Sequence, residues 1–177
     1  VLPAPADADP ALYGLLVPDQ GPRQAAAGAA VTLASFNVGT YRIMSQDKNT
    51  LSIYIGPGKH AFIHKQKYFD KNQAMPVNVV LGSDPLDWFA AACPVPAGVS
   101  EFDYAGGLRG APTKVIRSDI TGLPYPADAE IVIEGEIRPG EFKDEGPFGE
   151  WPGYYASPRS PEPFIRVKRI LYRNNPI

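Results

Sequence analysis

Prolines and glycines constrain this sequence most, because they interrupt it along its whole length. The chain of 177 residues contains 20 prolines and 17 glycines. Proline lacks a backbone donor and glycine favours turns, so their frequency indicates short strands and turns rather than long helices. Hydrophobic residues make up 44% of the chain, which is typical of a globular protein. The length suits one domain with a real core.

β-Branched and aromatic residues mark the expected strands. These strands cover residues 31–45, 49–56, 75–82, 111–118, 129–139 and 162–173, with "QDKN" (46–49) as a hairpin turn. Two stretches have the features of short helices. Residues 58–74 place apolar groups three and four apart, and residues 83–93 begin with Ser83 as an N-cap candidate and Pro85 in the first turn.

These elements predict a β-rich α+β domain, a barrel or split barrel with two short inserted helices. Residues 31–177 form this domain. Residues 1–30 are rich in Pro, Ala and Asp, and we expect them to be loosely ordered. The sequence contains no internal repeat.

Charge and cysteine content narrow the classes of partner. The chain has 17 Lys and Arg against 19 Asp and Glu, a net charge of −2. This balance gives no electrostatic indication of binding to nucleic acid or to a membrane surface. Cys93 is the one cysteine, which excludes a disulfide within the chain, and we interpret it as a packed side chain. With no secretory pattern at its start, we expect a cytoplasmic protein.

The stretch "DEGPFGEW" (144–151) holds two carboxylates, Glu145 and Glu150, in a segment that cannot be helical. Its two glycines allow a tight loop and its proline stiffens it. The loop can therefore aim both acids at one point. A solvated surface turn is the common alternative, and the stretch alone does not decide between the two.

Three further stretches contain candidate site residues. In "NVGTYR" (37–42), Asn37 and Arg42 would face opposite sides of a regular strand unless a bulge at Gly39 re-aims one of them. His60 and His64 share one helical face, but the HExxH motif of zinc proteases is missing. Glu101 lies in a stretch of prolines and glycine turns that lacks the GxGxxG fingerprint of dinucleotide-binding proteins.

Together these stretches resemble the UbiD-type decarboxylases, which use prenylated flavin mononucleotide (prenylated FMN). The resemblance begins near residue 31 and continues to the end of the chain. The matching pieces are "NVGTYR" (37–42), "KH" (59–60), "PVPAGVSE" (94–101), "PADAEIVIEGEI" (126–137) and "EGPFGEWPGYY" (145–155).

The resemblance implies a cofactor site and a metal. Asn37, His60 and Glu101 match the family's ligands for a divalent ion, usually Mn²⁺, which ties the flavin phosphate to the protein; K⁺ often sits beside it, held by carbonyls near residues 90–94. The residues that would bind the cofactor are Asn37, Val38, Gly39, Thr40, Tyr41, Arg42, Lys59, His60, Cys93, Pro94 and Glu101.

The resemblance also implies a catalytic trio of Arg42, Glu145 and Glu150. Arg42 would hold the substrate carboxylate and pair with Glu145, since the guanidinium fork matches a carboxylate. Glu150 would donate a proton to the carbon that loses CO₂. An acid with this role needs a desolvated pocket near neutral pH, and Phe148 and Trp151 are its local apolar candidates.

The implied reaction is the reversible non-oxidative decarboxylation of an unsaturated or aromatic acid. Family enzymes are longer and carry a C-terminal domain, so we expect this chain to act as part of a larger or split enzyme. A flavin prenyltransferase would supply the cofactor. The alternative is a non-catalytic flavin-binding module or assembly subunit.

Overall fold

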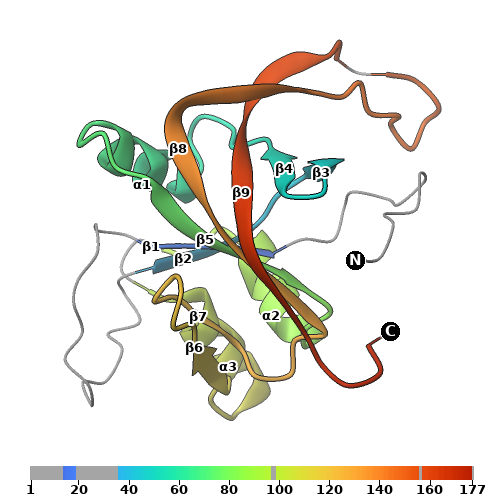
Figure 1. The fold of residues 1–177 in the computed structure, drawn as a ribbon. Helices are drawn as coiled ribbons and strands as arrows, with labels where there is room; N and C mark the ends of the chain where they lie inside the picture. Colours follow the sequence, from blue (N-terminus) through green and yellow to red (C-terminus); the bar gives the residue numbers. More distant parts are fainter. Residues whose placement is uncertain (1–13, 19–35, 97–98, 156, 177) are drawn as a thin grey trace.

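Figure 1 shows the computed structural model of the chain, which describes residues 14–18, 36–96, 99–155 and 157–176. The helices are α1 (His60–Phe69), α2 (Pro85–Ala92) and α3 (Glu101–Arg109). The strands are β1 (Gly14–Pro18), β2 (Phe36–Thr40), β3 (Ile43–Asp47), β4 (Thr50–Ile53), β5 (Met75–Leu81), β6 (Val115–Arg117), β7 (Pro124–Pro126), β8 (Ile131–Glu145) and β9 (Ser160–Tyr172).

Seven of the strands form one sheet in the order β2-β1-β5-β8-β9-β4-β3, while β6 pairs with β7. The recorded pairings are antiparallel. The long strands β8 and β9 run side by side across the molecule (Figure 1). Their register shifts twice, and such bulges bend a strand and increase its twist. At the first shift a Cβ on Gly135 would lie 2.4 Å from the Arg166 carbonyl oxygen, so glycine permits the close approach of the two strands.

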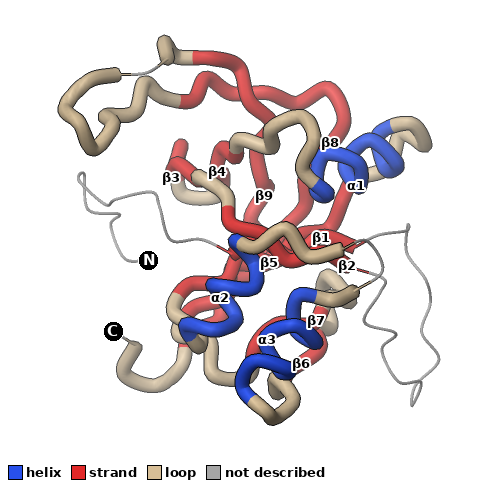
Figure 2. The backbone as a smooth tube through the Cα atoms, turned by 180° about the vertical axis from the view of Figure 1, so that it is seen from behind, coloured by secondary structure: helices blue, strands red, loops and turns tan. Residues whose placement is uncertain are grey.

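Two apolar clusters pack against the sheet. On β5, Val77 and Val79 belong to one cluster and Val80 to the other, because neighbouring side chains of a strand point to opposite faces. Helix α1 contributes Ala61 and Tyr68 to the first cluster, and α3 contributes Phe102 to the second. Figure 2 shows α1 on one side of β5 and α2 and α3 on the other. β5 thus contributes to both packed layers.

The predicted elements are largely present, but four features differ. α3 forms where we expected turns; its signals are the N-cap Ser100, whose side chain accepts from the Phe102 N–H, and Gly110 in the left-handed conformation at its end. The N-cap of α2 is Asp84 instead of Ser83, because Asp84 accepts from the Leu86 N–H.

β8 does not end at residue 139 as predicted but extends to Glu145. The expected loose segment 1–30 overlaps the described residues only at Gly14–Pro18. These residues form β1, which pairs with both β2 and β5. The other residues of that segment lie outside the described part of the chain.

Candidate active site

Arg42 and Glu145, far apart in the sequence, form a partly buried ion pair. Arg42 lies between β2 and β3, and Glu145 is the last residue of β8. The Glu145 Oε2 atom accepts from Nη2 of Arg42 at 2.7 Å and from Nε at 3.2 Å. Glu145 is only 1% exposed. Burial raises the pKa of Glu145, while Arg42 acts in the opposite direction and favours the ionised form.

Two aromatic rings lie against the Arg42 guanidinium. Its central carbon lies 4.3 Å from the centre of the Phe148 ring and 5.1 Å from that of Tyr54. Cation–π attraction to the two rings strengthens the hold on the cation, whose side chain remains 31% exposed. Among the described residues, Nη1 of Arg42 has no hydrogen-bond acceptor, so one edge of the guanidinium remains available to a ligand.

Glu150 and Trp151 are not among the described residues that contact Arg42 or Glu145. Glu150 is exposed, and its backbone N–H donates to the Tyr154 carbonyl at 2.7 Å. Within the described residues, Glu150 is not among the groups that contact the Glu145 carboxylate. Trp151 is 96% exposed, so the expectation that it forms a pocket wall is wrong for this structure, whereas Phe148 does cover Arg42. The two acids of the "EGPFGE" stretch are therefore not brought together here.

The structure gathers the three predicted metal ligands around β2. Asn37 and Glu101 are buried, each 5% exposed, and Glu101 Oε2 accepts from the Val38 N–H at 3.1 Å. His60 is the first residue of α1 and is exposed. Burial raises the pKa of Glu101, and the nearby His60 imidazole acts against that shift. Among the described residues, no three His, Cys, Asp or Glu side chains form a metal site.

Tyr41 connects the segment that holds Asn37 to the start of α1, where His60 lies. Its side chain is buried and hydrogen-bonds with the Ala61 backbone and the Asn37 side chain, and burial raises the pKa of Tyr41 to about 12. A Cβ on Gly39 would lie 2.6 Å from Cε2 of Tyr41. Glycine at position 39 therefore makes room for the Tyr41 ring, which links β2 to the start of α1.

The bulge considered at Gly39 does not form. β2 pairs with β1 in unbroken register from Phe36 to Thr40. Arg42 lies beyond the end of β2, so strand alternation does not set its direction relative to Asn37. Arg42 can point in a different direction from the β2 side chains because the strand ends at Thr40.

The remaining predicted cofactor residues lie at the ends of β2, α1 and α2. Thr40 is half-buried at the end of β2, and Lys59 is exposed at the N-cap of α1. Cys93 is the C-cap of α2, with exposed Pro94 after it. All three described helices contact β2. The buried His64, on the same face of α1 as His60, belongs to the packed side of the helix.

A cavity of about 290 Å³ lies beside this group. It is lined largely by apolar side chains of β2, β5, α2 and α3, among them Val38, Trp88 and Phe102. Val38 is its one lining residue among the predicted cofactor residues. The cavity is therefore separate from the Arg42–Glu145 pair.

Sequence reasoning missed two polar residues at the ion pair. Ser52 Oγ donates to Glu145 Oε1 at 3.4 Å, and Gln46 Nε2 donates to Ser52 Oγ at 3.1 Å. Gln46 was assigned to a turn and Ser52 to an ordinary strand. Nothing local in the sequence identifies them, since their partners on β8 lie more than 90 residues away.

A family model matches residues 29–177 of this chain: UbiD, the 3-octaprenyl-4-hydroxybenzoate carboxy-lyase Rift-related domain. The chain belongs to the UbiD family. Phenolic acid decarboxylase of Bacillus subtilis is 40% identical to this UbiD domain over 141 residues, which is 80% of the chain and 30% of that relative. The domain thus spans about a third of the length of the curated relatives it matches.

Solved structures agree with this assignment. An evolved dimeric form of the UbiD-class enzyme HmfF from Pelotomaculum thermopropionicum, in complex with prFMN, matches with a TM-score of 0.80 at 29% identity, over 94% of this chain and 36% of that one. Vanillic acid decarboxylase of Sedimentibacter hydroxybenzoicus (ShVdcCD), in its closed form, gives 0.81 at 30% identity, over 94% and 34%.

A more distant structure bears on the fold alone. The NADH:FAD oxidoreductase SgcE6 of Streptomyces globisporus matches with a TM-score of 0.56 at 11% identity, over 94% of this chain and 78% of that one. This likeness confirms the predicted split-barrel fold class. Among the described helices, none is long and apolar enough to cross a membrane.

Proposed function

We propose that this UbiD domain holds prenylated FMN in an enzyme that reversibly decarboxylates an unsaturated or aromatic carboxylic acid. The observation that carries the proposal is the partly buried Arg42–Glu145 pair, in which one edge of the guanidinium has no acceptor among the described residues. An arginine held in this way suits a carboxylate ligand, because its N–H groups match the two oxygens in a plane. Relatives that act on phenolic and vanillic acids support the substrate class.

Asn37, His60 and Glu101 would hold a divalent cation together with the flavin phosphate. The donor set fits in chemistry: an amide oxygen, an imidazole and a carboxylate suit Mn²⁺, and two of the three side chains are buried. Two helices begin beside them, and helix N-termini favour phosphate. Backbone carbonyls near Cys93 would hold K⁺. When bound, prenylated FMN supplies an electron-accepting ring for cleavage of the carbon–carboxylate bond.

Each member of the trio has a separate role. Arg42 binds and orients the substrate carboxylate, and Glu145 holds Arg42 in place by accepting two of its N–H groups. Glu150 delivers the proton to the carbon that has lost CO₂. Because Glu150 is exposed in this domain, we propose that another part of the enzyme covers it or that its loop closes over the substrate.

The rest of the enzyme comes from a longer chain or a partner subunit. This proposal rests on length: the domain covers 30% of the B. subtilis relative and 34% of the ShVdcCD chain. A flavin prenyltransferase would supply the cofactor. A second function is a non-catalytic flavin-binding module or assembly subunit. It is favoured by the exposure of Glu150, which does not complete a site within the described residues.

The test is the visible absorption spectrum and metal content of the assembled protein, produced together with a flavin prenyltransferase. We expect a bound modified flavin, Mn²⁺ and release of CO₂ from an aromatic or unsaturated acid. Bound flavin without CO₂ release would favour the non-catalytic module.

Glu101→Gln removes a charged ligand and should lower Mn²⁺ and flavin content together. Asp103→Asn, on the exposed side of the same helix turn, is the matched control. Full Mn²⁺ occupancy in Glu101→Gln would contradict the ligand assignment.

A further inference from the structure

The end of β8 is joined to β3 and β4 by side chains. In the sheet β8 pairs with β5 and β9, while β3 pairs with β4, so no recorded backbone ladder connects the end of β8 to the β3–β4 hairpin. Three consecutive residues of β8 nevertheless make contacts across this gap. Lys143 Nζ donates to Asp47 at 2.5 Å, the Asp144 carbonyl accepts from Gln46, and Glu145 accepts from Ser52.

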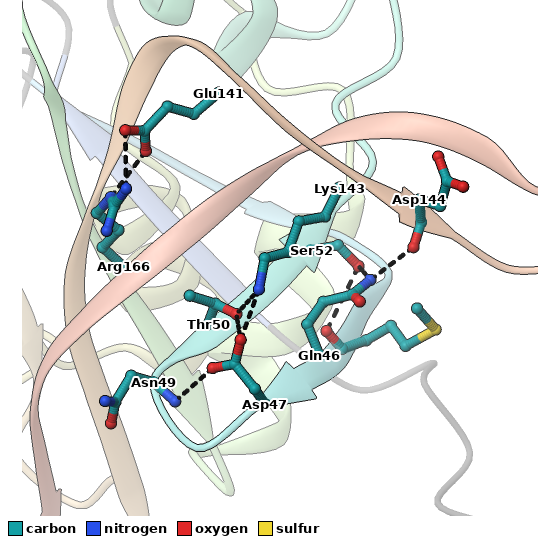
Figure 3. A network of polar contacts seen from close by, with 10 residues as sticks. Gln46, Asp47, Asn49, Thr50, Ser52, Glu141, Lys143, Asp144 and Arg166 are labelled. Carbon is teal, nitrogen blue, oxygen red and sulfur yellow. Dashed lines mark hydrogen bonds and ion pairs between the residues drawn. The ribbon is translucent and has the colours of Figure 1, made fainter.

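Gln46 occupies the centre of this arrangement. Figure 3 shows its side-chain amide between Ser52 and the backbone of Asp144. Nε2 donates to the Asp144 carbonyl at 2.7 Å and to Ser52 Oγ at 3.1 Å. One amide group thus fixes both the main chain just before Glu145 and the hydroxyl that contacts the Glu145 carboxylate.

Ser52 has one proton and two acceptors at equal distance. Its Oγ lies 3.4 Å from Glu145 Oε1 and 3.4 Å from the Met44 carbonyl. Since Gln46 donates to this hydroxyl, the Ser52 proton must point to one of those two acceptors. An ionised Glu145 attracts it more strongly than a neutral carbonyl does, because hydrogen bonds to charged groups are the stronger ones.

We propose that Gln46 and Ser52 are positioning residues that hold the Glu145 carboxylate, ionised and correctly placed, against Arg42. The inference rests on the proposed function of the Arg42–Glu145 pair. Arg42 takes Oε2 and Ser52 takes Oε1, so both carboxylate oxygens have fixed partners. Gln46 fixes Ser52 and the preceding peptide group in turn.

Two charged groups act on Glu145 besides its hydroxyl donor. Arg42 favours the ionised carboxylate, and Glu162, from β9, favours the protonated one. The Lys143–Asp47 pair belongs to the same side-chain connection but is more exposed. Removing the Ser52 donor therefore favours the protonated form of Glu145, and the pH at which Glu145 loses its charge should rise.

The experiment uses the assembled, flavin-loaded enzyme and measures decarboxylation as a function of pH. In Ser52→Ala, the acidic limb of kcat should move upward by about one pH unit, while activity on the alkaline side stays close to that of the parent. Gln46→Glu keeps the side-chain length, replaces the donor by an acceptor and adds a negative charge. It should move the limb at least as far and lower turnover at neutral pH about tenfold.

Two controls separate positioning from stability. Gln73→Glu adds the same charge in an exposed turn after α1 and should leave the limb unmoved. Ser52→Thr keeps the hydroxyl and should restore the parent profile. A purely structural role for Ser52 would lower activity equally at all pH values, and that result would overturn the proposal.

A second measurement does not depend on turnover. The carboxyl carbons of ¹³C-labelled glutamate can be followed by NMR as the pH changes, with Glu145 assigned by the signal missing in Glu145→Gln. Its titration should move upward in Ser52→Ala and Gln46→Glu, and an unmoved titration in both would refute the positioning role. If the titration moves while Glu145→Gln keeps full turnover, the positioning stands and the proposed catalytic function of the pair is wrong.

Discussion

The two acids of "EGPFGE" lie five residues apart and have opposite environments. Glu145 ends β8, is 1% exposed and is held by Arg42 and Ser52. Glu150 lies in the loop between β8 and β9, exposed beside Trp151. Within the domain, Arg42 and Glu145 of the proposed trio are therefore paired and held in place, whereas Glu150 is exposed to solvent. Substitution of a buried residue with fixed partners, such as Glu145, should lower both stability and activity. Substitution of an exposed residue, such as Glu150, should lower activity alone.

The largest effect is expected for Arg42→Lys in the assembled, flavin-loaded enzyme. Lysine keeps the charge but cannot offer two N–H groups to Glu145 and a further edge to the substrate. Turnover should fall by about 10² or more, with little change in flavin content. Arg166→Lys, in an exposed pair with Glu141, is the matched control and should remain active. Near-normal turnover in Arg42→Lys would mean that Arg42 does not bind the substrate carboxylate.

Glu150→Gln should be the next largest in activity. The variant should keep its fold and flavin and lose decarboxylation by a factor of about 10², the usual scale for a positioned acid. Hydrogen–deuterium exchange at the product's α-carbon should vanish with it, since that exchange needs only proton delivery and removal.

Glu145→Gln should be damaging in another way, because Arg42 loses its anionic partner. Exchange should survive in part in that variant. If Glu150→Gln exchanged deuterium at the parent rate, the proton would come from another group, and Glu150 would be a surface turn residue.

The free energy of unfolding should distinguish the substitutions of the two acids, with the larger loss expected for Glu145→Gln. Glu145→Gln leaves a partly buried guanidinium without its ionic partner and should lower the free energy of unfolding by about 1–3 kcal/mol. Glu150→Gln changes an exposed side chain and should stay within about 0.5 kcal/mol of the parent. Urea unfolding of both variants measures the difference, and equal losses would remove the contrast between the two regions.

The smallest effect is expected for Trp151→Ala, despite the size of the side chain. A residue that is 96% exposed has little packing to lose, so the unfolding free energy should change by less than about 0.5 kcal/mol. Phe148→Ala is the informative counterpart, since it removes a ring 4.3 Å from the Arg42 guanidinium and should cost about 1 kcal/mol or more. A similar cost for both would show that the loop packs more closely than the structure has it.

Much of the fold could be predicted from local pattern. Alternating β-branched residues located β4, β5, β8 and β9, and the 3–4 spacing located α1. α3 was missed because its glycines and the preceding prolines suggested turns, although Ser100 and Gly110 are good capping residues. β1 was missed because its short apolar run is surrounded by Pro, Gly and Ala, and its pairing with β2 and β5 stabilises it.

The sequence by itself determined the kind of chemistry available. The order of "NVGTYR", "KH" and "EGPFGEW" indicated the family, and the residue types named an amide, an imidazole, three acids and an arginine. Local pattern carries this information because side-chain chemistry and strand or helix propensity are properties of short segments.

Only the tertiary structure decided which of these groups meet. It placed Arg42 against Glu145 across 103 residues of sequence, added Ser52 and Gln46 to the pair, and left Glu150 in solvent. The physical reason is that burial and charge pairing depend on how β8 bends over the β3–β4 hairpin. The register shifts of β8 and the side-chain contacts of residues 143–145 set that bend, and neither can be inferred from strand propensity.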